Sequence, residues 1–387
     1  MIAPLKEIPS DTSPTPSQAQ SEHPWEITVR VPEKPTVCDY GYVTAGQSVG
    51  CTKEQLIKEV TSRAPELKFV WTPEFPQPVF PETVAFLTPI FKKRAANEAL
   101  KTLAWGAAFV AFGIVHALVE DDWRYLYRNF LAVIGAVILV EGAWAHYRTR
   151  SFTTEDVATE ASTVRFDAWI KQKSISGYTF GVATFLVVVG VGQLLGGTNE
   201  SIEAAGLVKP AVWQGQSWRL ATATLMHVNF LHFWMNFLGL LALARIIEQT
   251  IHRALVPVVF FASATCGSIF SLLLYPQTTS VGASGGLMGL VGFLAVAAMV
   301  NREKYPPKYL RRLLQAIVFV GVFGAIGFAM IDNGAHLGGL LGGAALGWLF
   351  LARQRFEKLK SALARLGVLS LVMIGLTAAI GIWQIFK

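Results

Sequence analysis

The chain has 387 residues, of which 52% are hydrophobic and 15% are charged, and its formal net charge is +7. The apolar residues are gathered into long runs, which is typical of a membrane protein and argues against an ordinary soluble domain. The positive charge does not indicate a nucleic-acid partner, because Lys and Arg lie mainly in short links between apolar runs, where they set membrane topology.

The N-terminal part of the chain is polar. Residues 1–35 hold many prolines among Ser, Thr, Glu and Gln, a mixture too polar to bury a core, so we expect a disordered tail. Residues 36–95 mix Val, Tyr and Phe with a short amphipathic stretch at Glu54–Val60. They form either a small docking domain or a juxtamembrane strap, and neither region carries a recognisable secretory signal.

About nine apolar segments follow, each near the ~20 residues that a helix needs to cross a hydrocarbon layer of ~30 Å. Glu141 interrupts the second segment, and the fourth is polar at its beginning. The segments are 102–119, 129–146, 177–196, 230–247, 254–275, 284–300, 313–331, 334–352 and 366–386. We therefore predict an all-α, polytopic membrane protein.

Charge asymmetry sets the orientation of these crossings. The links before the first segment and after the second, fourth, sixth and eighth are rich in Lys and Arg. The opposite links are poor in them, and the link at 197–229 holds only Lys209 and Arg219. Because Lys and Arg concentrate on the cytoplasmic side, we expect a cytoplasmic N-terminus and a C-terminus outside.

The three cysteines, Cys38, Cys51 and Cys266, lack the spacing of metal ligands and cannot all pair with one another. A bridge between Cys38 and Cys51 would need an extracytoplasmic location. Because their segment is assigned to the cytoplasm, where thiols stay reduced, we expect no structural disulfide.

A Gly-Ala-Ser-Gly motif opens one apolar segment, and an Ala-His-Leu-Gly-Gly motif lies near the start of a segment two crossings later. Both helices run inward from the same face, so Ser284 and His336 reach a similar shallow depth, where a contact is geometrically possible. An ionisable histidine in hydrocarbon is costly and is a functional-site hypothesis by default. We interpret the pair as a serine nucleophile and its base.

Glycines accompany both residues. Gly282 and Gly285 leave room for close backbone approach at the serine, and Gly339 and Gly343 form a Gly-x-x-x-Gly face on the histidine helix. The helix N-terminus at Ser284 presents unpaired N–H donors to a developing oxyanion. The alternative interpretation is that these small residues only permit tight helix packing.

Polar residues gather at the start of the fourth segment. His232 and Asn236 are four residues apart and share one helix face, whereas His227 is expected to point well away from it. Side-chain donors on a shared face fit an oxyanion site. A metal site is the weaker alternative, because no Asp, Glu or Cys accompanies the histidines at ligand spacing.

Trp218 and Arg219 precede this stretch in the 197–229 link, which also contains Trp213. One interpretation places the link partly in the membrane interface, where Trp is favoured. The other takes the pair as an ordinary aromatic anchor beside an Arg that is neutral for topology. These residues alone leave both interpretations open.

Four motifs thus follow one another: Trp218-Arg219, His227-x4-His232-x3-Asn236, Gly282-Ala-Ser284-Gly285 and Ala335-His336-x2-Gly339-x3-Gly343. In this order the chain resembles the rhomboid family of intramembrane serine proteases over about residues 170–352. The resemblance implies a six-helix core with Ser284 on its fourth helix and His336 on its sixth, forming a catalytic dyad without an acidic third member. It also implies cleavage of transmembrane substrates in or near the membrane, without a cofactor.

By the same resemblance, His232 and Asn236 help the Ser284 backbone N–H to bind the oxyanion, and His227 orders a loop. The resemblance also implies substrate cleavage at small residues that helix destabilisation exposes. We expect no bound metal.

Trp218 and Arg219 match the family motif that structures the first, membrane-lying loop. One departure is Met288, where many members carry a Tyr packed against the catalytic His; it affects the stacking contact and not the dyad. The segment 366–386 fits the subset of the family with one extra C-terminal helix, and the hairpin at 102–146 lies outside the resemblance.

The predicted domain plan follows from these observations. It comprises a disordered tail at 1–35, a small cytoplasmic region at 36–95, a transmembrane hairpin at 96–147, a cytoplasmic linker at 148–176, a rhomboid protease core at 177–352, and a linker with an extra C-terminal transmembrane helix at 353–387.

The chain is therefore interpreted as an intramembrane serine endopeptidase of a bacterial cytoplasmic membrane, or of an organelle membrane, with transmembrane protein substrates as partners. One alternative is a non-cleaving rhomboid-fold binder of membrane clients, against which the presence of both Ser284 and His336 argues. A transporter or channel is another alternative, but it leaves the four motifs unexplained. The sequence indicates neither the substrate nor the oligomeric state.

Overall fold

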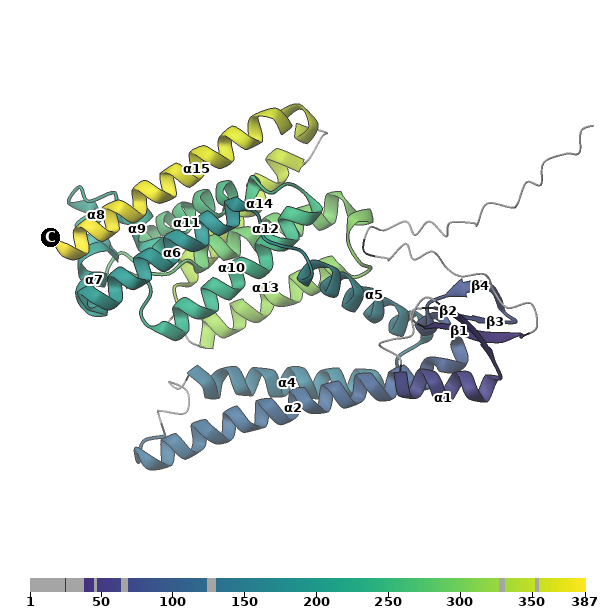
Figure 1. The fold of residues 1–387 in the computed structure, drawn as a ribbon. Helices are drawn as coiled ribbons and strands as arrows, with labels where there is room; N and C mark the ends of the chain where they lie inside the picture. Colours follow the sequence, from purple (N-terminus) through teal and green to yellow (C-terminus); the bar gives the residue numbers. More distant parts are fainter. Residues whose placement is uncertain are drawn as a thin grey trace, which may run out of the picture. The chain divides into compact units, whose positions relative to one another are not determined.

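The structure of the protein is a computed structural model (Figure 1). It describes Trp25 and residues 38–44, 47–63, 69–123, 130–326, 331–351 and 355–387. The predicted disordered tail at 1–35 lies outside the described residues, apart from Trp25. The chain divides into two compact units, which are Met1–Ala104 with Ile138–Ala161, and Trp105–Val137 with Ser162–Lys387.

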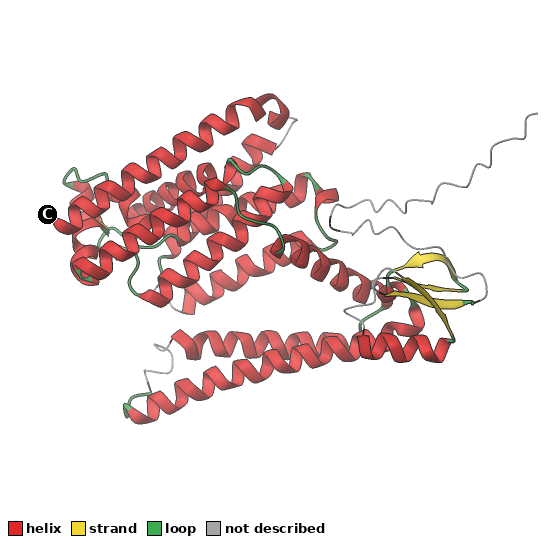
Figure 2. Ribbon diagram, viewed as in Figure 1, coloured by secondary structure: helices red, strands yellow, loops and turns green. Residues whose placement is uncertain are grey.

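The first unit contains an antiparallel four-stranded sheet with the strand order β2-β1-β3-β4 (Figure 2). Its strands are β1 (Tyr40–Thr44), β2 (Gln47–Cys51), β3 (Phe69–Thr72) and β4 (Phe75–Val79). Gly41 pairs with Trp71 across β1 and β3, and a side chain at Gly41 would clash with the Trp71 ring. This sheet is an addition to the predicted all-α fold, and it shows that region 36–95 is more than a strap.

Helix α1 (Lys53–Arg63) packs on the sheet. It starts at a reciprocal cap, because the Gln55 N–H donates to Thr52 Oγ1 (3.3 Å) and the Thr52 N–H donates to Gln55 Oε1 (3.0 Å). Leu56 and Val60 lie one turn apart and share a fully buried cluster with Val70 of β3. The predicted amphipathic stretch at Glu54–Val60 is thus confirmed: it lies in a helix that buries its apolar face.

Long helices follow the sheet. The elements are η1 (Pro81–Thr83), η2 (Ala85–Leu87), α2 (Thr88–Val119), α4 (Phe130–Thr149) and α5 (Thr154–Lys171). Helix α2 begins well before the predicted residue 102, because polar residues continue a helix that hydropathy alone does not mark. Helices α2 and α4 pack closely, since a β carbon on Gly135 would lie 2.6 Å from the β carbon of Phe109. Most of the predicted linker at 148–176 is the helix α5.

The second unit is built on a bundle of helices (Figure 1). They are α6 (Gly177–Gly196), α10 (Phe230–Thr250), α11 (Leu255–Leu274), α12 (Ser284–Val300), α13 (Tyr309–Ile326), α14 (Asn333–Leu351) and α15 (Arg355–Phe386). The shorter elements are α7 (Thr198–Ala205), β5 (Leu207–Val208), α8 (Lys209–Trp213), α9 (Arg219–Thr222), η3 (Ala223–Leu225), β6 (Thr279–Ser280) and η4 (Arg302–Lys304). Ser284 therefore opens the fourth helix of the α6 to α14 bundle, and His336 lies on the sixth.

In the described part of the chain, seven helices are long and apolar enough to cross a membrane. They are Ala85–Val119, Leu131–Thr149, Gly177–Gly196, Phe230–Thr250, Leu255–Leu274, Asn333–Leu351 and Ala362–Phe386. The two further predicted crossings correspond to α12, which is apolar but shorter, and to α13. The chain is an integral, polytopic membrane protein.

Helix α15 packs against α6 through small residues of both helices. A β carbon on Gly181 would lie 3.0 Å from the Leu371 side chain, and one on Gly375 would lie 2.9 Å from the Phe185 ring. The Tyr178 hydroxyl also donates to the Ala364 carbonyl (3.3 Å). The extra C-terminal helix is therefore part of the bundle.

Candidate active site

Ser284 follows a loop whose backbone favours glycine. Gly282 has a φ of +136°, a conformation that L side chains rarely adopt. Its N–H donates to the Ala223 carbonyl (3.0 Å), which ties the loop to η3. Helix α12 then begins directly at Ser284, so the serine lies among backbone N–H groups that have no helical partner.

His336 lies in the first turn of α14, and its Nε2 is 2.9 Å from the Ser284 Oγ. The other ring nitrogen, Nδ1, is buried and has no hydrogen-bond partner among the described residues. An imidazole that is hydrogen-bonded to a hydroxyl can take its proton as the oxygen attacks. The structure thus brings together the predicted nucleophile and base, whose catalytic roles stay predictions.

Glycines bring the backbones of α12 and α14 into contact. A side-chain carbon on Gly339 would clash with the Gly285 carbonyl, and one on Gly343 would clash with the Gly289 carbonyl. A β carbon on Gly285 would itself lie 3.3 Å from the Ala335 carbonyl oxygen. Such close approach is how membrane helices associate without a hydrophobic driving force. The glycines permit tight helix packing, and the same packing sets the distance between Ser284 and His336. The two interpretations, helix packing and a role at the candidate site, are therefore compatible.

His232 on α10 lies beside the glycine that precedes the serine. A β carbon on Gly282 would lie 2.8 Å from Cε1 of His232 and 3.7 Å from the Ser284 Oγ. A glycine at this position therefore satisfies the backbone conformation and also makes room for the imidazole next to Ser284. Met288, the residue at the position of the family's Tyr, is buried on α12.

Asn236 lies one turn further along α10 and is buried. Its side-chain amide donates one N–H to the His232 carbonyl at 2.8 Å. An Asn amide carries two N–H donors, so the second is not used by this bond. The structure therefore places His232 next to the loop before Ser284, whereas the hydrogen bond of the Asn236 side chain lies within α10.

His227 contradicts the expectation that it points away from His232. The two ring centroids are 5.1 Å apart, with an angle of 75° between the ring planes. The expectation was wrong because α10 begins only at Phe230, so helical spacing does not apply to a residue in the preceding loop. Asn229 caps that helix by accepting the His232 N–H at 2.8 Å.

A buried glutamine holds this loop in place. The His227 N–H donates to Gln193 Oε1 (2.8 Å), and the Gln193 amide donates back to the His227 carbonyl (3.1 Å). Burial, and next the neighbouring His232, lower the pKa of His227 to about 3, so its ring is neutral at physiological pH. The sequence interpretation missed Gln193; its only signal was a polar amide late in an apolar run.

Trp218 and Arg219 organise the 197–229 link. The buried guanidinium of Arg219 donates to the carbonyls of Glu203 (3.0 Å) and Gly206 (2.8 Å), and its Nε donates to the Gln216 side chain. The guanidinium carbon also lies 4.7 Å from the centroid of the Trp218 ring. Arg219 is therefore a buried clamp of the loop and not a topology-neutral surface residue.

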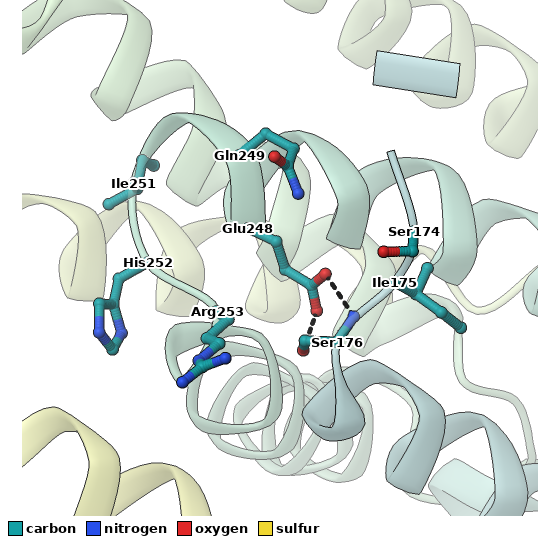
Figure 3. Close-up of a pocket in the computed structure, with 8 residues that line it drawn as sticks. All are labelled: Ser174, Ile175, Ser176, Glu248, Gln249, Ile251, His252 and Arg253. Atoms are coloured by element: carbon teal, nitrogen blue, oxygen red, sulfur yellow. Dashed lines mark hydrogen bonds between the residues drawn. The ribbon is translucent and has the colours of Figure 1, made fainter. Parts of the chain in front are cut away.

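A cavity of about 370 Å³ lies between the residues just before α6 and the C-terminal end of α10 (Figure 3). It is lined by Ser174, Ile175, Ser176, Glu248, Gln249, Ile251, His252 and Arg253. The Glu248 carboxylate accepts hydrogen bonds from the Ser176 N–H (2.8 Å) and hydroxyl (2.5 Å), which helps to hold the start of α6. His232 and Glu248 are near opposite ends of α10, about 24 Å apart at 1.5 Å per residue, so this cavity is separate from the serine site.

Comparisons with known proteins identify the part of the chain that carries the site. Residues 214–353 match the family model of the Rhomboid domain. RHOMBOID-like protein 7 of Arabidopsis thaliana is 33% identical over 167 residues, covering 42% of this chain and 53% of that protein. RHOMBOID-like protein 6, mitochondrial, of Arabidopsis thaliana is 34% identical over 164 residues, with coverages of 42% and 53%. Rhomboid protease GluP of Bacillus subtilis (strain 168) is 34% identical over 161 residues, covering 39% of this chain and 31% of GluP.

The family resemblance is confirmed over this region, and the chain contains a rhomboid domain. The domain match spans all four motifs, from Trp218 to Gly343. The chain matches about half of the length of the first two relatives, with 53% of each protein covered. The sheet of the first unit and the α2/α4 hairpin lie outside the matched domain.

Proposed function

We propose that this integral membrane protein, which contains a rhomboid domain, is an intramembrane serine endopeptidase that hydrolyses peptide bonds of transmembrane protein substrates. The observation that carries the proposal is the 2.9 Å hydrogen bond between the Ser284 Oγ and Nε2 of His336. Both residues lie at the beginnings of adjacent, closely packed helices, which favours access of water from one membrane face. Hydrolysis needs that water.

In the proposed reaction the Ser284 Oγ attacks the scissile carbonyl carbon while Nε2 of His336 takes the hydroxyl proton. Collapse of the tetrahedral intermediate breaks the C–N bond, and His336 returns the proton to the leaving amine. A water molecule then attacks the acyl-enzyme with His336 as base, which releases the acid product and restores the serine.

The developing oxyanion is proposed to accept hydrogen bonds from the Ser284 backbone N–H, from His232 and from Asn236. The position of His232 beside Gly282 supports this role. For Asn236 the second N–H of the amide is the available donor, because the first is bonded to the His232 carbonyl. A donor accelerates the reaction only if it stabilises the transition state more than the ground state. A well-placed donor of this kind lowers the activation free energy by about 3 kcal/mol.

The test is covalent labelling of the detergent-solubilised protein by a fluorophosphonate probe. Wild type is expected to be labelled, and Ser284→Ala and His336→Ala are expected to lose the label. Ser62→Ala is the matched control, because this serine is exposed on α1, in the compact unit that does not contain Ser284, and should not affect labelling. Absence of labelling in folded wild type would overturn the proposal and favour a binder that does not cleave its clients.

We further propose that the N-terminus lies in the cytoplasm of a bacterial cell and that the active site faces the outer side. The basic links between the helices support this orientation. A membrane-impermeant maleimide added to intact cells should then leave Cys38 and Cys51 unmodified until the membrane is permeabilised. Modification of either thiol in intact cells would contradict the proposed orientation and place the N-terminal region outside the cytoplasm.

A further inference from the structure

The first turn of α8 contains a fully buried cation. The Lys209 side chain is 0% exposed, although the residue lies in a link that the charge pattern assigns to the non-cytoplasmic side. Burying an ammonium group is costly unless it is paired, so such a residue calls for an explanation. Neither the proposed reaction nor the four motifs uses it.

Lys209 contacts two segments that lead into the active-site helices. Its Nζ donates to Thr278 Oγ1 at 2.7 Å and lies 5.7 Å from the centroid of the Tyr275 ring. Both residues belong to the loop before Ser284. On its other side, Nζ is 3.9 Å from Oδ2 of Asp332, which immediately precedes α14.

Asp332 fixes the turn that carries His336. Its Oδ1 accepts the Ala335 N–H at 2.9 Å, as an N-cap does, and its backbone carbonyl accepts the His336 N–H at 3.1 Å. The Ser271 hydroxyl of α11 also donates to Oδ2 of Asp332. A displacement of Asp332 would therefore move the first turn of α14, including the His336 backbone.

The serine side of the site is tied to the same point. Strand β5 pairs with β6 through Leu207 with Ser280 and Val208 with Thr279. Lys209 directly follows β5, and Ser280 lies four residues before Ser284. The cation is thus located where the loop before the serine and the start of the histidine helix converge.

We propose that Lys209 and Asp332 are positioning residues, whose ion pair between a buried lysine and a partly buried aspartate joins the loop before Ser284 to the N-terminus of α14 and so keeps the Ser284–His336 hydrogen bond aligned. The proposal rests on the proposed protease function. Stability alone is a poor explanation, because a buried ion pair is often no more stabilising than apolar residues of the same volume. Alignment is a better one, because small misplacements of reacting groups reduce rates strongly.

The test is a double-mutant cycle with Lys209→Met, Asp332→Asn and the double variant, using fluorophosphonate labelling to separate the maximal labelling rate constant from the probe's half-saturation concentration. Each single variant should lower the maximal rate constant by about 10- to 100-fold and leave the half-saturation concentration within about 2-fold. The double variant should be no slower than the slower single variant, because both changes break one interaction. Lys304→Met is the matched control, since this lysine is exposed, and it should label at the wild-type rate.

Apparent melting temperatures of all variants separate alignment from folding. Variants that melt earlier but keep the wild-type rate constant in the folded fraction would overturn the positioning role and leave a merely structural one. If Lys209→Met does not fold, Asp332→Asn decides, because Asn keeps the shape and capping ability of Asp. If wild type itself is not labelled, the protease function and this inference both fail; if wild type is labelled and Asp332→Asn matches it, only this inference fails.

Discussion

Helices α12 and α14 differ sharply from α13, the helix that lies between them in the sequence. The first two meet backbone to backbone, and a side-chain carbon on Gly339 of α14 would clash with the Gly285 carbonyl of α12. On α13 a β carbon at Gly321 would meet nothing within 4 Å. Large apolar side chains of α13 face outward instead, with Val318 64% and Val322 52% exposed.

The difference shows what holds a site in a membrane. Lipid tails are as apolar as Leu or Val, so outward-facing side chains of α13 provide no strong drive toward the other helices. The contact between α12 and α14 depends instead on close packing over small residues. The candidate dyad lies at the closely packed contact, where the distance between two side chains is least free to vary.

The largest expected effect comes from breaking this contact with Gly339→Val. The new side chain meets backbone that cannot rotate away, so we expect a loss of about 3 kcal/mol or more in stability, together with loss of fluorophosphonate labelling. Gly321→Val on α13 is the matched control and should change stability by no more than about 0.5 kcal/mol. Apparent melting temperatures in detergent and labelling rates measure both effects, and equal effects of the two variants would contradict the comparison.

A smaller effect is expected from Gly282→Ala, just before α12. Its φ of +136° strains any L side chain, and the added methyl would lie 2.8 Å from the His232 ring. We expect a stability loss of about 1–3 kcal/mol and a labelling rate reduced more than stability alone explains. Gly177→Ala, where nothing lies within 4 Å, is the control. Wild-type labelling by Gly282→Ala would show that His232 and the serine loop do not need this close fit.

At neutral pH we expect the smallest effect from His227→Phe, and the pH dependence of stability tests how well the loop before α10 excludes water. The pKa of His227 is lowered to about 3 in the fold, while the unfolded chain keeps a value near 6.5. Below about pH 6.5 the unfolded state takes up a proton that the folded state does not. The contribution of neutral His227 to the free energy of unfolding is therefore fully present above that pH. It decreases toward pH 3, by at most about 1.4 kcal/mol per pH unit. His227→Phe should flatten the dependence of melting temperature on pH in this window. Identical slopes for the variant and the wild type would contradict the lowered pKa of His227 in the folded protein.

Much of the fold was readable from the sequence because membrane helices are long, uniform and marked by their composition. Among the described residues, each predicted crossing coincides largely with a helix, and the match of residues 214–353 to the rhomboid domain agrees with motifs that were visible in the chain. Helix ends were less predictable. Helix α2 starts at Thr88 because a helix continues through polar residues wherever its backbone hydrogen bonds are kept.

Other features depended on contacts between distant residues. The sheet of the first unit uses short strands, and β1 pairs directly with β3 although β2 and α1 lie between them in the sequence. Short strands carry little periodicity, so pairing partners and register were not predicted. His227 was misplaced for a related reason, since the start of α10 decides whether helical spacing applies to it.

The sequence by itself determined the membrane class, the order of the helices and the residue types of the candidate site, because hydropathy and short motifs are local properties. Only the tertiary structure decided that Ser284 and His336 lie within hydrogen-bond distance and that Gly282 makes room for His232. It alone showed Lys209 buried against Thr278 and Asp332. Distances between residues far apart in the chain are set by how helices and loops pack together, and no local pattern encodes that packing.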